Sequence, residues 1–283
     1  MSGLDPAALQ AWVGREERRT DTLAPWPAAA LTAALDRDDP PGPGEPLPPL
    51  WHHLYFLPVV RASATGPDGH PRRGDFLPPV PLPRRMWAGG RLAWERALRV
   101  GEALERVSTV RAVELKRGRS GPLVFVLVEH RFLSADGPVL VEEHDIVYRE
   151  PPRGEEAGPP GLAPSGGCWQ RAWRPDPVLL FRYSALTFNG HRIHYDHPYA
   201  TGVEGYPGLI VHGPLLATLM LDLVRRERPA AFVRRFDFRA TAPLFADREL
   251  LVRGEPEPNG GSVRLWITGP EGGLAMRGTV ALG

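Results

Sequence analysis

The feature that most limits the fold of this chain is one strongly apolar helix followed at once by four short strands. Residues 213–224 read Gly-Pro-Leu-Leu-Ala-Thr-Leu-Met-Leu-Asp-Leu-Val, which is apolar on almost every face and predicts a buried helix. Pro214 fits the first turn of such a helix. The strand-like runs that follow are 232–241, 249–253, 262–268 and 274–282. Together they predict a helix wrapped by a curved antiparallel sheet.

The N-terminal part repeats this order more loosely, with helical material first and strands last. Asp5-Pro6 predicts a helix start, and apolar spacing extends that helix to about Arg19. The segment 51–60 is apolar and aromatic and predicts extended chain, whereas 63–90 is rich in Gly, Pro and Arg and predicts a long excursion. Strands are then expected at 102–116, 123–132 and 139–148.

A Pro- and Gly-rich run from Pro151 to Pro164 divides the chain and is a linker by composition. We therefore expect two domains, at 1–150 and 169–283, joined by a linker at 151–168. A chain of 283 residues is long enough for one or two such domains. The expected fold class is α+β.

Composition and charge argue against several classes of protein. The net charge of +1 gives no support to nucleic-acid or membrane-surface binding. No uncharged run approaches the ~20 residues that a membrane span needs, and the N-terminus lacks a signal-peptide pattern. The single cysteine, Cys168, leaves no intrachain disulfide, which is compatible with a reducing compartment. We expect a cytoplasmic protein without nucleic-acid or membrane partners.

Histidine is concentrated in one short part of the chain. Four of the nine histidines lie between His191 and His212, just before the apolar helix. His194 is the natural candidate for proton transfer, because the ordinary pKa of histidine is about 6.5. Asn189 and Gly190 tolerate turn geometry, so a tight bend could bring the Asn189 and His194 side chains together. The alternative is that His194 is a hydrogen-bonded core residue.

The start of the apolar helix is a second candidate feature. The backbone N–H of Gly213 would point out of the helix end, where it could stabilise a developing oxyanion. Gly213 could instead simply permit close packing. His212 could support the reacting groups from behind, or could cap the turn.

The spacing of His191, His194 and His197 also matches three zinc ligands on one helical face. Gly190 and Pro198 disfavour a regular helix there, so we expect no metal. Nucleotide-binding loops, a nucleophile elbow and a C-x-x-C pair are missing from the sequence.

A specific motif covers residues 180–217. It includes Phe181-Arg-Tyr-Ser-Ala-Leu-Thr-Phe-Asn-Gly-His-Arg-Ile-His-Tyr-Asp196 and, further on, Ile210-Val-His-Gly213. These residues resemble the MaoC-like, or R-specific hydratase 2, family of hot-dog acyl-thioester hydratases and dehydratases. They are most similar to the branch with itaconyl-CoA and mesaconyl-C4-CoA hydratases and type 2 hydroxyacyl-thioester dehydratases. The resemblance implies a double hot-dog fold with a degenerate N-terminal copy and a catalytic C-terminal copy.

The resemblance also implies an activity, namely water addition across the C2=C3 bond of an enoyl-CoA thioester, or the reverse dehydration. Itaconyl-CoA or mesaconyl-C4-CoA is the first expected substrate, and no cofactor is required. In that family an aspartate and a histidine activate water, but here Asn189 occupies the aspartate position. The implied roles are therefore base for His194, positioning for Asn189 and oxyanion donor for Gly213. The expected substrate-binding residues are His191, Arg192, Arg182 and His212.

Other interpretations stay open. A 3-hydroxyacyl-thioester dehydratase of lipid metabolism has the same chemistry, whereas a thioesterase fits the histidine-centred motif less well. Asn189 in place of the aspartate also fits a non-catalytic acyl-CoA-binding protein. Arg182 or Arg192 could pair with a substrate carboxylate, or could be ordinary solvated surface. Family analogy predicts a homodimer.

Overall fold

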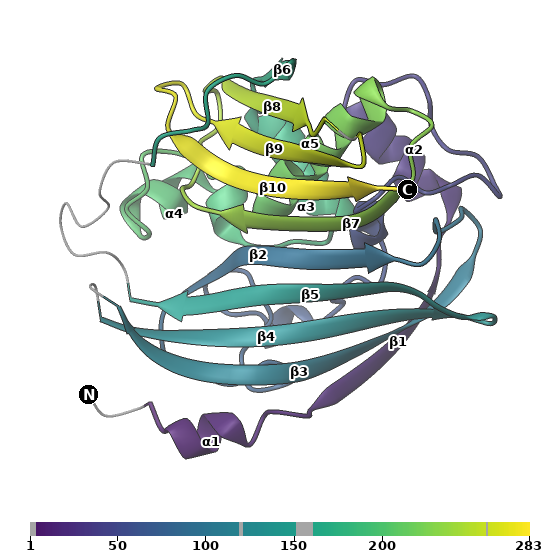
Figure 1. Cartoon of the computed structure of the whole chain (residues 1–283). Helices are drawn as coiled ribbons and strands as arrows, with labels where there is room; N and C mark the ends of the chain where they lie inside the picture. Colours follow the sequence, from purple (N-terminus) through teal and green to yellow (C-terminus); the bar gives the residue numbers. More distant parts are fainter. Residues whose placement is uncertain (1–3, 119–120, 151–160, 259) are drawn as a thin grey trace.

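The computed structural model describes residues 4–118, 121–150, 161–258 and 260–283. Ten strands form one antiparallel sheet in the order β1-β3-β4-β5-β2-β7-β10-β9-β8-β6 (Figure 1). The strands before the expected linker are β1 (Glu16–Thr22), β2 (Arg84–Trp94), β3 (Ala103–Gly118), β4 (Gly121–Ser134) and β5 (Gly137–Arg149). Those after it are β6 (Trp169–Trp173), β7 (Val233–Ala240), β8 (Leu250–Pro256), β9 (Ser262–Thr268) and β10 (Leu274–Leu282).

The two halves of the sheet share one topology. Each half places its first strand at an outer edge, then its third, fourth and fifth, and its second at the centre. The halves meet through β2 and β7, where Gly90 pairs with Phe238 and Leu92 with Phe236. A Cβ at Gly89 would lie 2.5 Å from the Phe238 carbonyl oxygen, so this junction requires glycine. Residues 151–160 of the expected linker lie outside the described residues.

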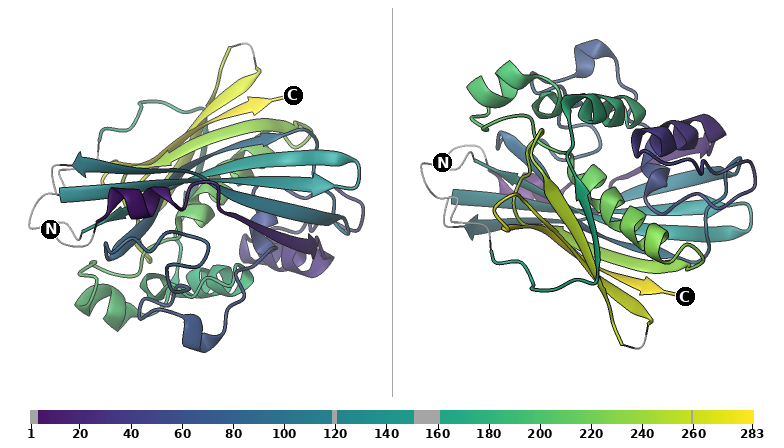
Figure 2. Two further views of the ribbon diagram at one scale, coloured as in Figure 1. Left: turned by 90° about the horizontal axis from the view of Figure 1, so that it is seen from below. Right: turned by 90° about the horizontal axis from the view of Figure 1, so that it is seen from above.

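Most helices lie on one side of the sheet, but the first, Pro6–Gln10, lies at the sheet edge beside β3 (Figure 1). The helices are α1 (Pro6–Gln10), α2 (Pro25–Ala34), α3 (Pro177–Leu186), α4 (His197–Gly202) and α5 (Gly213–Glu227), with 3₁₀ turns η1 (Trp51–Leu54), η2 (Ala62–Ala64) and η3 (Arg192–His194). Helix α5 lies along the sheet, and α2, α3 and α4 form a layer outside it (Figure 2). Every residue of α5 from Leu215 to Val224 is buried, which confirms the predicted interior helix. No helix in these described ranges is long and apolar enough to span a membrane.

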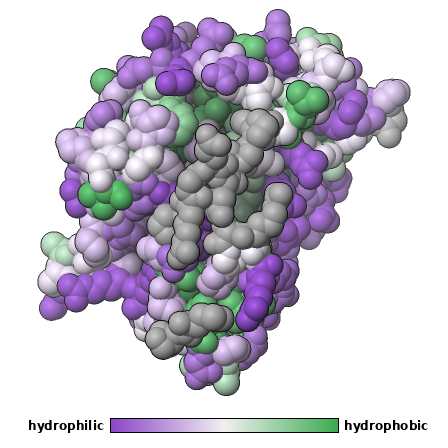
Figure 3. Space-filling model, turned by 90° about the vertical axis from the view of Figure 1, so that its left-hand side faces the viewer, coloured by the Kyte–Doolittle hydropathy of each residue, from purple (hydrophilic) through white to green (hydrophobic). Residues whose placement is uncertain are grey.

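The first repeat lacks an equivalent of α5. Between β1 and β2 it has the ten-residue α2 and the short turns η1 and η2. Trp51 and Leu54 of η1 belong to the same hydrophobic core cluster as Leu219 of α5. In place of a long helix, the first repeat therefore has short segments that pack on the shared core. The side of the molecule on the left of Figure 1 is mainly hydrophilic, with apolar residues interspersed (Figure 3).

Three expectations for the N-terminal part are wrong. The first helix ends at Gln10, and β1 follows at Glu16–Thr22, a wholly polar edge strand with no apolar alternation to reveal it. The segment expected to be extended from residue 51 begins with the 3₁₀ turn η1, after Leu50 in a left-handed conformation with φ 69°. The excursion predicted for 63–90 already contains β2 from Arg84.

Candidate active site

A Schellman motif at the end of α3 turns the chain into the histidine segment. The Asn189 N–H donates to the Ser184 carbonyl at 2.8 Å, and the Phe188 N–H donates to the Ala185 carbonyl at 3.3 Å. Phe188 adopts φ 49°, a left-handed conformation that costs a non-glycine residue about 1–2 kcal/mol. The Asn189 Oδ1 then accepts the His191 N–H at 3.0 Å, which tightens the bend. The segment is therefore bent where the sequence suggested a turn.

His194, at the end of η3, is buried with 6% of its surface exposed. Its Nδ1 lies 2.7 Å from the carbonyl oxygen of Ile210. Because a carbonyl can only accept, Nδ1 carries the hydrogen and donates it. The neutral ring therefore keeps its lone pair at Nε2, where a general base needs it. Burial lowers the pKa of His194 to about 4, so the ring is uncharged at neutral pH.

His212 connects His194 to two helices. Its ring is stacked on that of His194, with centroids 3.6 Å apart and an interplanar angle of 19°. Its Nε2 lies 2.8 Å from Ser184 Oγ on α3, and the residue is the N-cap of α5. The ring is fully buried, and burial lowers the pKa of His212 well below its ordinary value. His212 thus lies behind the His194 ring, between α3 and the start of α5.

Gly213 is the first residue of α5, so its N–H has no partner within the helix. A Cβ at Gly213 would lie 3.8 Å from Cε3 of Trp87, which is ordinary van der Waals contact. Close packing therefore does not demand glycine at this position. Trp87, on β2, places an aromatic wall from the first repeat over the helix end.

Residues from the first repeat, which the sequence did not single out, extend the histidine cluster. The ring of His70 lies 4.0 Å from that of His191, centroid to centroid, and His191 lies edge-on to His194 at 5.4 Å. Asp68 Oδ2 lies 3.0 Å from His70 Nδ1. In the sequence, Asp68 and Gly69 only indicate a turn. Their proximity to the motif arises from tertiary packing, which no local pattern reports.

The two arginines expected near the substrate differ in their surroundings. Arg192 binds Asp196 Oδ2 through Nε and Nη2 at 2.9 and 2.7 Å, and its Cζ lies 4.1 Å from the centre of the Tyr199 ring. Arg182 is exposed on α3. Arg85 of β2, in contrast, is half-buried, and no carboxylate within the described part of the chain lies at ion-pair distance from it.

Among the residues that the structure describes, two groups of side chains have ligand atoms close enough for a metal ion. In each group these atoms lie within 4.8 Å of one another, and the groups are Asp68, His70 and His191, and His52, His53 and Glu142. The Glu142 carboxylate accepts from the Nε2 atoms of His52 and His53 at 2.9 and 2.8 Å, so hydrogen bonds also account for that spacing. His191, His194 and His197 do not form such a group within the described ranges, and His197 is exposed at the start of α4.

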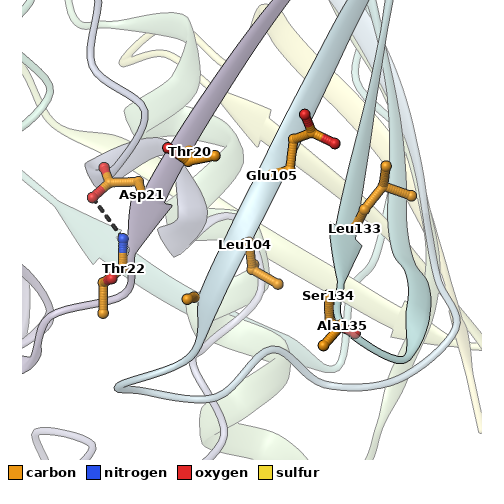
Figure 4. Close-up of a pocket in the computed structure, with 9 residues that line it drawn as sticks. Thr20, Asp21, Thr22, Leu104, Glu105, Leu133, Ser134 and Ala135 are labelled. Atoms are coloured by element: carbon orange, nitrogen blue, oxygen red, sulfur yellow. Dashed lines mark hydrogen bonds between the residues drawn. The ribbon is translucent and has the colours of Figure 1, made fainter.

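An open pocket at the ends of β1, β3 and β4 is not a candidate for acid–base chemistry (Figure 4). Asp21 in this pocket accepts the N–H groups of Thr22 and Phe56 at 2.7 and 2.8 Å. Glu105 lies 3.4 Å from the Arg18 guanidinium. No histidine lines the pocket, and its carboxylates already have partners.

The repeated topology and the buried histidine beside a helix N-terminus define a class of protein, the double hot-dog acyl-thioester hydratases and dehydratases. The chain matches the family hydroxyacyl-thioester dehydratase type 2 over residues 50–246, and it belongs to that family. It is 46% identical to mesaconyl-C(4)-CoA hydratase of Chloroflexus aurantiacus, across 99% of this chain and 100% of that protein. It is accordingly an enzyme of the hydro-lyase type.

Solved structures support the fold. HtdX of Mycobacterium tuberculosis superposes with a TM-score of 0.65 at 19% identity, covering 93% of this chain and 99% of that one. A second Mycobacterium tuberculosis protein, whose structure is described as a double hot-dog fold, gives a TM-score of 0.56 at 16% identity and 96% coverage of both chains. The fold of this chain is therefore the double hot-dog fold.

Proposed function

We propose that this enzyme adds water across the C2=C3 bond of a short dicarboxylic enoyl-CoA thioester, with mesaconyl-C4-CoA and itaconyl-CoA as the first substrates to test. One observation carries the reaction: a buried, neutral imidazole whose Nε2 lone pair is free lies beside the start of α5. The relative at 46% identity is named for mesaconyl-C(4)-CoA, which supports the substrate.

In the proposed mechanism, His194 takes a proton from a water molecule that Asn189 helps to position. The hydroxide adds to C3, the π electrons move towards C2 and the thioester oxygen, and the proton returns from His194 to C2. The Gly213 N–H would hold the developing oxyanion, and one such donor is typically worth about 3 kcal/mol. Every proton in this sequence comes from the water, so no cofactor is needed.

Arg85 supports the choice of a dicarboxylic substrate. It is two residues from Trp87 on β2 without an intervening bulge, so both side chains lie on the same face of the sheet. Trp87 is the residue that covers the start of α5. Directly across the strand pair lies the buried Tyr148, whose hydroxyl interacts with Arg85 itself. A guanidinium and a hydroxyl here would suit the free carboxylate of the acyl group.

The charge around Arg85 favours an anion. Burial lowers the pKa values of His70 and His191, and the positive charge of Arg85 lowers both further. Arg73, nearby, donates to the carbonyl oxygens of Val80 and Pro83. A substrate carboxylate at Arg85 would reduce the excess of positive charge at this end of the site.

The test is turnover of purified enzyme with mesaconyl-C4-CoA, itaconyl-CoA and crotonyl-CoA, followed by loss of the enoyl-thioester absorbance. We expect the dicarboxylic thioesters to react faster than crotonyl-CoA. His194→Gln should lower kcat by at least about 100-fold, the low end of general acid–base contributions, whereas the exposed His197→Gln should not. Undiminished turnover by the His194 variant would show that His194 is not the general base.

The family name favours a second candidate, dehydration of a 3-hydroxyacyl thioester of lipid metabolism, which is the same chemistry in reverse. A preference for longer, monocarboxylic chains would support it. Tight binding of every thioester without turnover would favour a non-catalytic acyl-CoA-binding protein. By family analogy we also propose a cytoplasmic homodimer, for which sedimentation equilibrium tests the mass.

A further inference from the structure

The motif that defines the site lacks a carboxylate. Asn189 occupies the position where the resembled family has an aspartate, and a carboxamide cannot accept a proton as a base does. Asp196, the next acidic residue along the chain, binds Arg192 and caps α4 through the Tyr199 N–H. The rings in contact with His194 are those of His191 and His212, and Asp196 forms no ion pair with either of them.

A carboxylate reaches this cluster from the other half of the molecule. Asp68 lies in the loop 66–70 of the first repeat, and its carboxylate accepts from both the backbone N–H and the Nδ1 of His70, at 3.1 and 3.0 Å. The ring of His70 packs on His191 at 4.0 Å, and His191 packs edge-on against His194. Asp68, His70, His191 and His194 therefore form one continuous row.

The backbone of the loop is locked onto the motif. The Arg192 N–H donates to the Asp68 carbonyl at 2.9 Å, and Arg192 Nη1 donates to the Pro67 carbonyl at 3.0 Å. Gly69 has φ 88°, and a Cβ there would lie 1.8 Å from the Gly190 carbonyl oxygen. Only glycine allows this approach. The position of Asp68 is thus fixed by contacts between the loop 66–70 and residues 190–192.

We propose that Asp68 is the positioning carboxylate of the active site, acting through His70 and His191 on the base His194 in place of the aspartate that Asn189 replaces. The inference rests on the proposed hydratase function. When His194 takes the proton from water, positive charge appears in a buried site. The negative charge of the ionised Asp68 offsets that positive charge across the packed rings, and the proton stays on His194 until it leaves to C2, so no further reactant is involved.

The electrostatics of the row agree with this role. Burial lowers the pKa of His191 to about 2 and also lowers that of His70, and the negative charge of Asp68 opposes the effect at both rings. Burial acts to raise the pKa of Asp68 itself, but the hydrogen bonds and charge of His70 outweigh burial, and its pKa lies below the ordinary value. Asp68 is therefore ionised at neutral pH.

The test compares Asp68→Asn with the control Asp75→Asn, since the Asp75 side chain is 96% exposed. We expect Asp68→Asn to lower kcat on the best substrate by roughly 10- to 100-fold while KM changes less than about threefold, since general acid–base steps contribute 10²–10⁴-fold in total. Adding Asn189→Asp to Asp68→Asn should restore most of the lost kcat. His70→Gln should match Asp68→Asn, and the pair should be non-additive.

The inference is wrong if kcat of Asp68→Asn stays within twofold of wild type, or if Asn189→Asp does not restore the lost kcat. In either case, turnover by the wild-type enzyme would still support the proposed function. Loss of activity after dialysis against EDTA, regained with zinc, would also overturn the inference, since Asp68, His70 and His191 would then be ligands. If no thioester reacts, long-range ¹H–¹⁵N spectra still decide. We expect the His70 proton on Nδ1 in wild type, whereas a proton on Nε2 alone would refute the contact.

Discussion

Among single residues, burial keeps the imidazoles of the site uncharged, and one backbone hydrogen bond determines which nitrogen of His194 carries the hydrogen. His194 has its Nδ1 hydrogen fixed by the Ile210 carbonyl, so its tautomer is determined without a neighbouring carboxylate. His191, His194 and His212 all have pKa values lowered by burial, so they are neutral rings at pH 7. Stacked neutral rings suit a base that must accept a proton and return it.

Arg85→Gln should lower kcat/KM for mesaconyl-C4-CoA by roughly 10- to 100-fold, because hydrogen bonds to a charged group contribute about 1.5–3 kcal/mol. The value for crotonyl-CoA, which has no second carboxylate, should stay within about threefold. The measurement is the ratio of the two values, with the exposed Arg182→Gln as the matched control. Equal losses on both thioesters would instead place Arg85 at the CoA phosphates.

The sequence predicted the candidate residues that lie close together along the chain and missed those that do not. His191, His194 and His212 were identifiable because four histidines fall within one short segment before an apolar helix. Asp68, His70 and Arg85 lie in Gly-, Pro- and Arg-rich chain that indicates only turns. Their place beside the motif depends on the loop contact between Gly69 and Gly190, which is a property of the tertiary structure.

Among the secondary-structure elements, helix α5 matters most for the proposed reaction, because its first residue provides the proposed oxyanion donor. The Gly213 N–H is unpaired because it begins the helix, not because of its side chain. Gly213→Pro should therefore lower kcat by roughly 10²–10³-fold, the usual effect of losing one oxyanion donor, yet the helix should survive because its first position tolerates proline. His212 already has φ −60° and ψ 131°, which suits a residue before proline.

Gly213→Ala is the control, since it keeps the N–H and its Cβ meets Trp87 at ordinary contact distance. We expect its kcat within about tenfold of wild type. Thermal unfolding should show both variants folded. If the two variants lose activity equally, the backbone N–H is not the oxyanion donor.

Elements with strong periodicity were predictable, whereas the edge strands and most of the central strand β2, which begins in Gly-, Pro- and Arg-rich chain, were not. The strands β3, β4, β5 and β7 to β10 and the helix α5 follow the predicted runs closely, because each alternates or buries apolar residues. The edge strands β1 and β6 were missed. Each pairs on one side only, so few of its side chains are buried and the apolar signal is weak.

At the scale of the whole molecule, buried neutral histidines make stability depend on pH. Burial lowers the pKa of both His52 and His194 to about 4. The unfolded chain, with a histidine pKa of about 6.5, binds these protons first. This contribution to stability is therefore complete above pH ~6.5 and is lost as the pH falls towards about 4.

We expect the urea concentration at the midpoint of unfolding to decrease as the pH is lowered from 7 to 5. Unperturbed Asp and Glu side chains remain largely ionised in this pH range. The measurement is urea unfolding at pH 7, 6 and 5, monitored by tryptophan fluorescence. His194→Gln should reduce the slope of stability against pH. A flat dependence over this window would show that the buried rings do not resist protonation.

A buried ion cluster links segments from both repeats. The Asp222 side chain on α5 is 1% exposed and accepts from Arg37 Nη1 at 2.9 Å and from Arg226 Nε at 2.6 Å. Arg37 follows α2, so the cluster joins the N-terminal layer to the central helix. Asp222→Ala would leave two guanidinium groups without their shared carboxylate, and breaking such a buried pair costs about 3–5 kcal/mol.

The expected result is a fall in Tm of roughly 10 °C relative to wild type, since each kcal/mol corresponds to about 2–4 °C in chains of this size. Asp38→Ala, at an exposed position beside the same loop, is the control and should change Tm little. Because Asp222 lies towards the middle of α5, well beyond the Gly213 end, kcat of the Asp222 variant at low temperature should remain near wild type. If Tm drops no further than in the control, the ion cluster does not hold the two repeats together, and the shared apolar core joins them without it.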